Sequence, residues 1–269
     1  RDRSVSRGLG DVYKRQGIGS VFAGEQNTVP GTAEQPFVVT DGLFDQTKTE
    51  SDLGLSKIEG AETVTVFTAT DDTDHYCNGV VMTEFKGKLY TQWQSSAKDE
   101  DAEDTWVAYS VSDDNGATWS EPKVLVPTID NGYCSSGGWF VSGDTLVSYI
   151  NVWYSDTTPR GGFAYYVEST DGEHWSEMKP VLMKDGTPME GIIEQDPHVL
   201  ASGRIVNAAH FQPGLFAYPI YTDDPSGTKG WVKAQYTCME QGEGATTSRE
   251  MEPSLFVNED GTIVMTFRD

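Results

Sequence analysis

The stretch SDDNGATW, residues 112–119, returns twice further along the chain in altered form. The later copies are STDGEHW (169–175) and the degenerate TDDPSGTKGW (222–231). All three end in tryptophan, at intervals of 56 residues: Trp119, Trp175 and Trp231. An aspartate that accepts backbone N–H bonds, a glycine with positive φ and a tryptophan that packs into a sheet favour a tight turn between strands. The copies therefore predict a recurring structural unit rather than a catalytic motif.

A second repeated feature is a pair of apolar runs around a glycine turn. It occurs in NGVVMTEFKGKLYTQW (78–93), SGGWFVSGDTLVSYI (136–150), PHVLASGRIVNAAH (197–210) and PSLFVNEDGTIVMTF (253–267). The turn glycines are Gly87, Gly143, Gly203 and Gly261. Such a pattern is typical of a β-hairpin. With a third apolar run, the aspartate turn and a short fourth run, each repeat predicts a four-stranded sheet.

Four-stranded sheets repeated along a chain are typical of a β-propeller. We therefore predict an all-β fold with about three to four blades in residues 61–269, truncated at the C-terminal end. Residues 17–60 are predicted to be an N-terminal lead-in, and TVTVFTA (63–69) an outer strand that closes the ring. Residues 1–16 are basic, unlike the rest, and are interpreted as a non-native, adapter-derived tail, with a basic recognition tail as the alternative.

Composition excludes several classes of partner. The chain has 42 acidic and 19 basic residues, a net charge of −23, which disfavours nucleic acid as a partner. It has no run of 18 apolar residues, so no membrane span is expected. No motif requires a metal or an organic cofactor. Localisation stays open; a signal peptide before the first residue would imply an extracellular or periplasmic protein.

The three cysteines are too few for a disulfide scaffold. Cys77 and Cys134 lie in matching contexts, HYCNG and GYCSSG, one repeat apart. They either form a disulfide in an exported protein or remain free. Cys238 is expected to be an unpaired strand residue.

Propeller ligands usually bind over the central channel, where the innermost strand of each blade begins. Nine positions before the turn glycines lie Asn78, Cys134, Glu194 and Glu252. Their polar neighbours are Asp74, His75, Tyr76, Tyr133, Ser135, Gln195, Asp196, His198 and Arg249. Three histidines lie at hairpin ends: His75, His198 and His210. Carboxylates, imidazoles and hydroxyls at matching places predict a cavity for a polar ligand; the alternative is a set of solvated loop residues.

The chain resembles the sialidase superfamily. The full Ser-x-Asp-x-Gly-x-Thr-Trp match is the Asp-box of sialidase-like propellers, and Glu252-Pro253 is followed by Arg268 sixteen residues after Glu252. The resemblance implies six or seven blades in the complete fold. It also implies that Glu252 polarises a nucleophilic tyrosine and that Arg268 binds the sugar carboxylate. Asp101 lies at about the family's spacing for the acid/base, in a loop where Asp99, Glu100, Glu103 and Asp104 compete with it; a solvated loop is the alternative.

One position departs from the sialidase pattern, because Cys77 stands where the first carboxylate-binding arginine is expected. A thiol does not replace a bidentate arginine. Three hypotheses follow. The first is a sialidase-like glycoside hydrolase acting on terminal sugars of complex or acidic glycans, with Glu252, Asp101 and His75 as catalytic candidates. Its candidate binding residues are Arg268, Tyr76, Asn78, Glu194, Asp196, His198 and Arg249. The second is a polysaccharide lyase with His75 as acid/base, assisted by Tyr76 or Tyr133, and the third is a non-catalytic sugar-binding propeller.

Overall fold

The computed structural model describes residues 45, 47, 48, 59–70, 72–236, 245–258 and 261–268. The chain divides into two compact units, Arg1–Thr63 and Val64–Asp269. The predicted tail and nearly all of the predicted lead-in lie outside the described residues. Within the described residues the regular elements are all strands, in the second unit, and no helix there has the length and apolar character to cross a membrane.

The second unit consists of successive antiparallel sheets. The first sheet runs in the order β1 (Tyr76–Phe85), β2 (Lys88–Ser96), β3 (Trp106–Ser112), β4 (Lys123–Val126). The second runs in the order β5 (Gly132–Ser142), β6 (Thr145–Tyr154), β7 (Phe163–Ser169), β8 (Lys179–Pro180). The third is β10 (His198–Val199), β11 (Ile205–Phe211), β12 (Phe216–Thr222), β13 (Val232–Lys233), with β9 (Gly191–Ile192) also paired to β11. A last pair is formed by β14 (Met251–Val257) and β15 (Ile263–Arg268).

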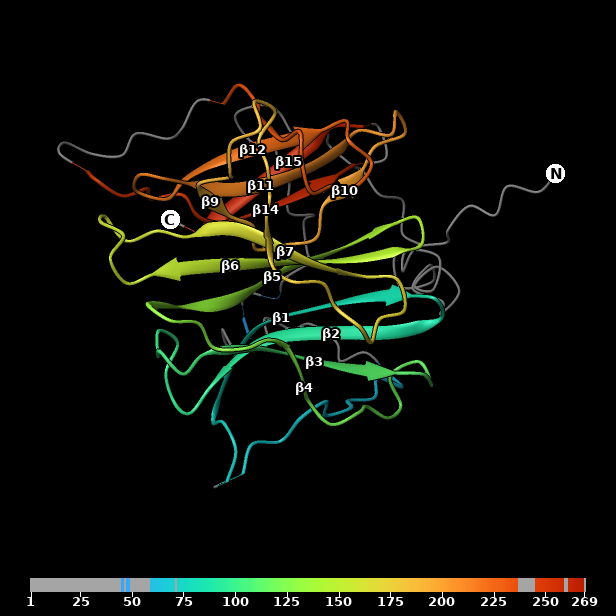
Figure 1. Cartoon of the computed structure of the whole chain (residues 1–269). Coiled ribbons are helices and arrows are strands. Elements are labelled where there is room, and N and C mark those ends of the chain that lie inside the picture. Colours follow the sequence, from blue (N-terminus) through green and yellow to red (C-terminus); the bar gives the residue numbers. More distant parts are fainter. Residues whose placement is uncertain are drawn as a thin grey trace. The chain divides into compact units, whose positions relative to one another are not determined.

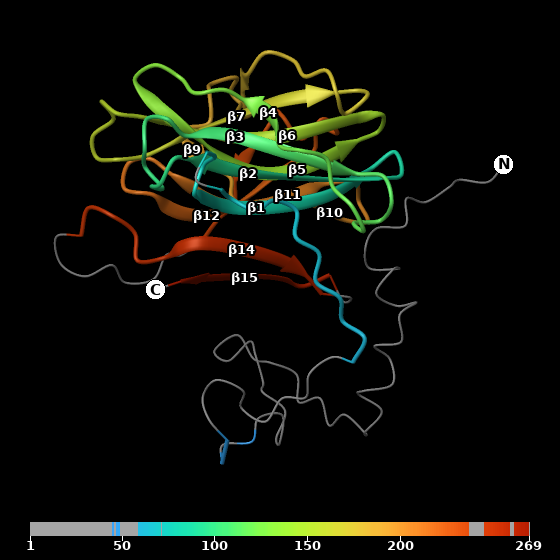
Figure 2. The same cartoon turned by 90° about the horizontal axis from the view of Figure 1, so that it is seen from below.

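The sheets follow one another in chain order, from the cyan-green β1–β4 through the yellow-green β5–β7 to the orange β11 and β12 (Figures 1 and 2). Each predicted turn glycine lies between the first two strands of its sheet or strand pair. All four adopt positive φ: 77° at Gly87, 57° at Gly143, 86° at Gly203 and 86° at Gly261. The four predicted hairpins are therefore confirmed.

The aspartate turns join the third and fourth strands of the three sheets, as predicted. In the first copy Asp114 Oδ1 accepts the Thr118 backbone N–H at 2.8 Å, and the Ser112 hydroxyl accepts the Gly116 N–H at 2.8 Å. The hydrogen bonds from Thr118 lower the pKa of Asp114 to about 2. The second copy uses Asp171 to accept two backbone N–H groups, and the degenerate third uses Asp224 to accept one. The local hydrogen bonding therefore survives loss of the full motif.

Neighbouring sheets share apolar cores. The first core joins the first and second sheets and includes Tyr90, Trp139 and Ile150. The second joins the second and third sheets, and a smaller third core joins β11 to Leu255 of β14. Each sheet is thus held by its neighbour in the chain, which fixes the relative positions of their innermost strands.

Two expectations from the sequence differ from the structure. Residues 63–69 form no strand, although they alternate as a strand would; Phe67 instead stacks on Trp93, with 6.2 Å between ring centroids. Cys77 is exposed and Cys134 is buried, and both are free thiols, so the disulfide alternative is not realised. Cys238 lies outside the described residues.

The third turn tryptophan offers a test of this repeat. Trp231 has no exposed surface, and its indole N–H donates to the Gly227 carbonyl at 2.8 Å. Trp231→Ala is expected to lower the free energy of unfolding by about 3–5 kcal/mol, because it leaves a large cavity. Urea denaturation measures the effect. Trp119 occupies the corresponding place but is only half-buried, so Trp119→Ala is the matched control with a smaller loss; equal losses would contradict the packing.

Candidate functional site

The innermost strands of the repeats are interrupted at similar places. The pairing of β1 slips between Asn78 and Val81, that of β5 between Ser136 and Trp139, and that of β14 between Met251 and Ser254. In the third sheet the innermost strand is split into β9 and β10, with residues 193–197 between them. Such bulges leave residues outside the ladder and redirect their side chains.

A cavity of about 610 Å³ lies at these interruptions, within the size range of small-ligand sites. Five residues predicted for the site line it: Asn78, Asp101, Glu194, Glu252 and Arg268. Their neighbours Tyr133, Ser135 and Gln195 line it too, whereas Cys134 does not. Among the lining residues that the sequence did not single out are Arg160, Trp153, Gln94 and Ser136. The cavity thus collects residues from all four repeats.

Glu252 and Arg268 form a bidentate ion pair at one side of the cavity. Arg268 Nε donates to Glu252 Oε2 at 3.0 Å, and its Nη2 donates to Oε1 at 2.7 Å. The pair forms because β14 and β15 are antiparallel, with Met251 opposite Arg268. These hydrogen bonds hold the pKa of Glu252 below its usual range, so the carboxylate is ionised at neutral pH.

Asp101 lies in a second cluster, which combines the β2–β3 and β6–β7 loops with residues of β5 and β6. Its Oδ1 accepts the Tyr133 hydroxyl at 2.7 Å and also a hydrogen bond from Arg160. Burial, followed by the hydrogen bond to Asp101, raises the pKa of Tyr133, which keeps the phenol protonated as a donor. Trp153 backs the cluster: its ring stacks on Tyr133 with centroids 6.1 Å apart, and the Arg160 guanidinium lies 5.1 Å from the Trp153 ring centroid.

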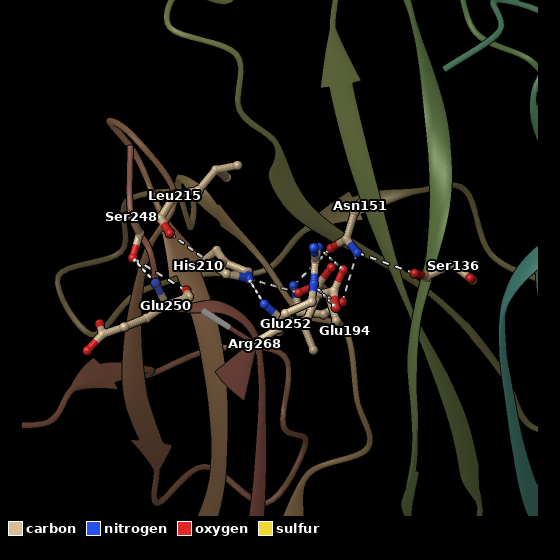
Figure 3. Close-up of polar contacts among 10 residues, drawn as sticks. Ser136, Asn151, Glu194, His210, Leu215, Ser248, Glu250, Glu252 and Arg268 are labelled. Carbon is tan, nitrogen blue, oxygen red and sulfur yellow. Dashed lines mark hydrogen bonds and ion pairs between the residues drawn. The ribbon is translucent and has the colours of Figure 1, made fainter. Parts of the chain in front are cut away.

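A buried histidine connects the Glu194 carboxylate to the backbone of Glu252. His210 Nε2 lies 3.0 Å from Glu194 Oε2 and accepts the Glu252 backbone N–H at 2.8 Å (Figure 3). Asn151 supports the segment that carries Glu194, because its side chain bonds both the carbonyl and the N–H of Ile193. The sequence placed His210 only at a hairpin end.

Five predicted site residues do not line the cavity: His75, Tyr76, Asp196, His198 and Arg249. Asp196 accepts the Trp139 backbone N–H at 2.6 Å, and burial raises its pKa to about 6. His198 Nε2 lies 2.7 Å from the Leu255 carbonyl oxygen. Both side chains therefore bridge neighbouring repeats. His75 is exposed, and its backbone N–H donates to Ala97.

The sequence did contain a signal for Arg160. Asp101 was found in the loop between the second and third strands of the first repeat. The equivalent loop of the second repeat, between β6 and β7, carries Arg160. The described residues include no group of three or more His, Cys, Asp or Glu side chains arranged to hold a metal ion.

Comparison with known families gives a match over residues 87–269, which is more than half of the chain. The matching family is the BNR repeat-like domain. The chain belongs to this family. A comparison with curated protein sequences gives no match.

Solved structures similar to this BNR repeat-like chain include glycoside hydrolases. A Hadza microbial sialidase has a TM-score of 0.54 at 17% identity, with 74% of this chain and 43% of that chain covered. The NanB sialidase of Streptococcus pneumoniae has a TM-score of 0.52 at 14% identity, with 76% and 50% covered. A family 117 glycoside hydrolase of Zobellia galactanivorans has a TM-score of 0.51 at 14% identity, with 75% and 66% covered.

These likenesses confirm the predicted all-β, propeller-like fold of the BNR repeat-like chain. It is a fold that sialidases and other glycan-acting hydrolases use. The chain spans about two fifths to two thirds of the length of these three structures.

The exposure of the Glu252–Arg268 pair predicts that it contributes little to folding. The two side chains are 56% and 65% exposed, and exposed ion pairs are screened by water. Glu252→Gln and Arg268→Gln are each expected to leave the urea midpoint nearly unchanged. Trp231→Ala in the same titration is the positive control. A loss as large as that of Trp231→Ala would show that the pair holds β14 and β15 together.

Proposed function

We propose that the protein is a sialidase-like glycoside hydrolase that removes terminal sugars from complex or acidic glycans. The observation that carries the proposal is that two carboxylates from different repeats, Asp101 and Glu252, line one cavity. Glycoside hydrolysis commonly uses two carboxyl groups, one that protonates the leaving oxygen and one that serves the nucleophile.

Asp101 is proposed as the general acid. Tyr133 and Arg160 both donate to its Oδ1, so this oxygen is occupied. Oδ2 accepts no hydrogen bond from the described residues, so it is the oxygen through which Asp101 is proposed to deliver a proton. That proton passes to the glycosidic oxygen as its bond to the anomeric carbon breaks, and the rest of the glycan leaves with a neutral hydroxyl.

Glu252 is proposed as the group that serves the nucleophile. Arg268 keeps it ionised, and an ionised carboxylate can accept the proton of a water molecule or hydroxyl that attacks the anomeric carbon. Arg268 is proposed to bind a substrate carboxylate or hydroxyl. Asn78 and Glu194 extend the polar lining, and Trp153 and Tyr133 add aromatic surface against which a sugar can pack.

The lyase hypothesis, with His75 as acid/base, finds no support in the cavity, because neither His75 nor any other histidine is among its lining residues. The non-catalytic sugar-binding hypothesis remains the competitor. Both hypotheses predict that a sugar binds in the cavity, but only the hydrolase hypothesis predicts that it is cleaved. Measuring turnover therefore distinguishes them.

Activity is tested with the complete protein and a panel of chromogenic aryl glycosides of sialic acid and of neutral sugars. Glu252→Gln and Asp101→Asn are each expected to lower kcat/KM by about 10²–10⁴-fold on the substrate that the wild-type protein cleaves, because each loses one proton-transfer group. Circular dichroism and urea denaturation check that the variants fold.

The matched control is Glu168→Gln. Glu168 also forms an exposed ion pair on a strand, with Lys179 at 2.8 Å, but it lies outside the cavity lining. It is expected to keep wild-type turnover. Binding of a glycan by the wild-type protein without turnover of any substrate, or near wild-type turnover by Glu252→Gln, would overturn the hydrolase proposal in favour of a binding propeller.

A further inference from the structure

His210 is a buried titratable side chain at the candidate site, yet it does not line the cavity. It lies on β11, and its side chain is 1% exposed. Its two ring nitrogens face three groups. Nδ1 lies 2.8 Å from the Leu215 carbonyl oxygen, and Nε2 faces both the Glu252 backbone N–H and Glu194 Oε2.

The two backbone partners require one tautomer of the ring, whereas the Glu194 carboxylate can accept a hydrogen bond only from a protonated Nε2. A backbone carbonyl only accepts hydrogen bonds, so Nδ1 must carry a proton. A backbone N–H only donates, so Nε2 must present a lone pair to Glu252. His210 is therefore neutral, with its proton on Nδ1, whenever it holds the Glu252 amide.

Glu252 needs this support because its backbone is in an unfavourable conformation. Its φ is +53°, in the left-handed region that is unfavourable for a residue with a side chain. The corresponding bulge position in β1, one residue after the last paired residue, is Gly79, with φ of +64°. The fourth repeat thus carries a functional side chain where the first has glycine, and the His210 hydrogen bond helps to hold it there.

Glu194 competes for the same nitrogen. If Nε2 becomes protonated, it can donate to the Glu194 carboxylate, which lies 3.0 Å away, but it can no longer accept from Glu252. The other charged groups drawn around this junction are the Glu252 carboxylate and Arg268, which are paired with each other, and the buried Glu250, whose Oε1 accepts the Tyr236 hydroxyl at 2.9 Å (Figure 3). The carboxylate of Glu194 is therefore the group placed to stabilise a protonated His210.

We infer that His210 is a positioning residue whose neutral ring holds Glu252 in its left-handed conformation, and that protonation of His210 transfers its hydrogen bond to Glu194 and releases the Glu252 backbone. The inference rests on the proposed role of Glu252 for its effect on turnover. Its structural part does not depend on any activity; this part comprises the tautomer of His210 and its hydrogen bond with the Glu252 N–H.

The test compares His210→Gln with His210→Phe. The Gln carbonyl oxygen can take the place of Nε2 and accept the Glu252 N–H, but it does not titrate; Phe fills the space without accepting. On a cleaved aryl glycoside, His210→Phe is expected to lower kcat about 10–100-fold. His210→Gln is expected to retain most of kcat and to extend activity to lower pH than the wild type. His174→Gln, which alters an exposed histidine–aspartate pair in a turn, is expected to leave both kcat and the pH profile unchanged.

A structural measurement separates this inference from the proposed function. In protein labelled with ¹⁵N-histidine, the His210 signals, assigned by their loss in His210→Gln, should show a protonated Nδ1 and an unprotonated Nε2 at neutral pH. The Glu252 amide should be protected from hydrogen exchange in the wild type and His210→Gln, and exposed in His210→Phe. A protonated Nε2, an unprotected Glu252 amide, or an acidic limb that does not move in His210→Gln would overturn the inference. Inactivity of every protein with these NMR results intact would overturn only the proposed function.

Discussion

A regular β-strand sends successive side chains to opposite faces of its sheet. In this molecule the second and third sheets each have an apolar core on both faces, shared with the sheet or strand pair before and after them. A strand without interruption would therefore have few side chains to offer a ligand. Side chains become available to a ligand where the strands are irregular, at the bulges in β1, β5 and β14 and in the gap between β9 and β10. Since the shared cores fix where the innermost strands lie, the bulges open towards one cavity. The site is therefore a consequence of irregularity at a matching place in each repeat.

The same constraint explains which parts of the site the sequence could predict. Counting back from the turn glycine reached Asn78 and Glu252, because in the first and fourth repeats that distance ends at the bulge. In the second repeat the count reached Cys134, which is buried, since the β5 bulge begins only at Ser136. Local turn chemistry, by contrast, depends on residues close in sequence, and the glycine and aspartate turns were predicted correctly for that reason. The contact of Arg160 with Asp101 joins residues 59 positions apart, so the sequence signal for Arg160 was not local but lay in the equivalent loops of the first two repeats.

Residues 63–69 were expected to be the outer strand that closes the ring, and such a strand needs the edge of another sheet as its partner. Among the described residues this segment pairs with no strand. Polar residues near strand starts were expected either to line a ligand cavity or to be solvated loop residues; Asp196 and His198 satisfy backbone groups of the two neighbouring repeats. A buried junction between sheets needs such partners, because an unsatisfied N–H or C=O there is costly.

The charges in the cavity form two local pairs rather than a cluster of one sign. Arg160 is held by Asp101 and Arg268 by Glu252, while Glu100 and Glu194 add two further carboxylates to the lining. With a net charge of −23, the chain repels anionic molecules at long range, so any recognition of an acidic sugar has to come from contact with these two guanidinium groups. Both pairs are largely exposed and therefore add little to folding. What the pairs do provide is orientation: each arginine is held towards the cavity before a ligand arrives, which reduces the ordering that binding would otherwise require.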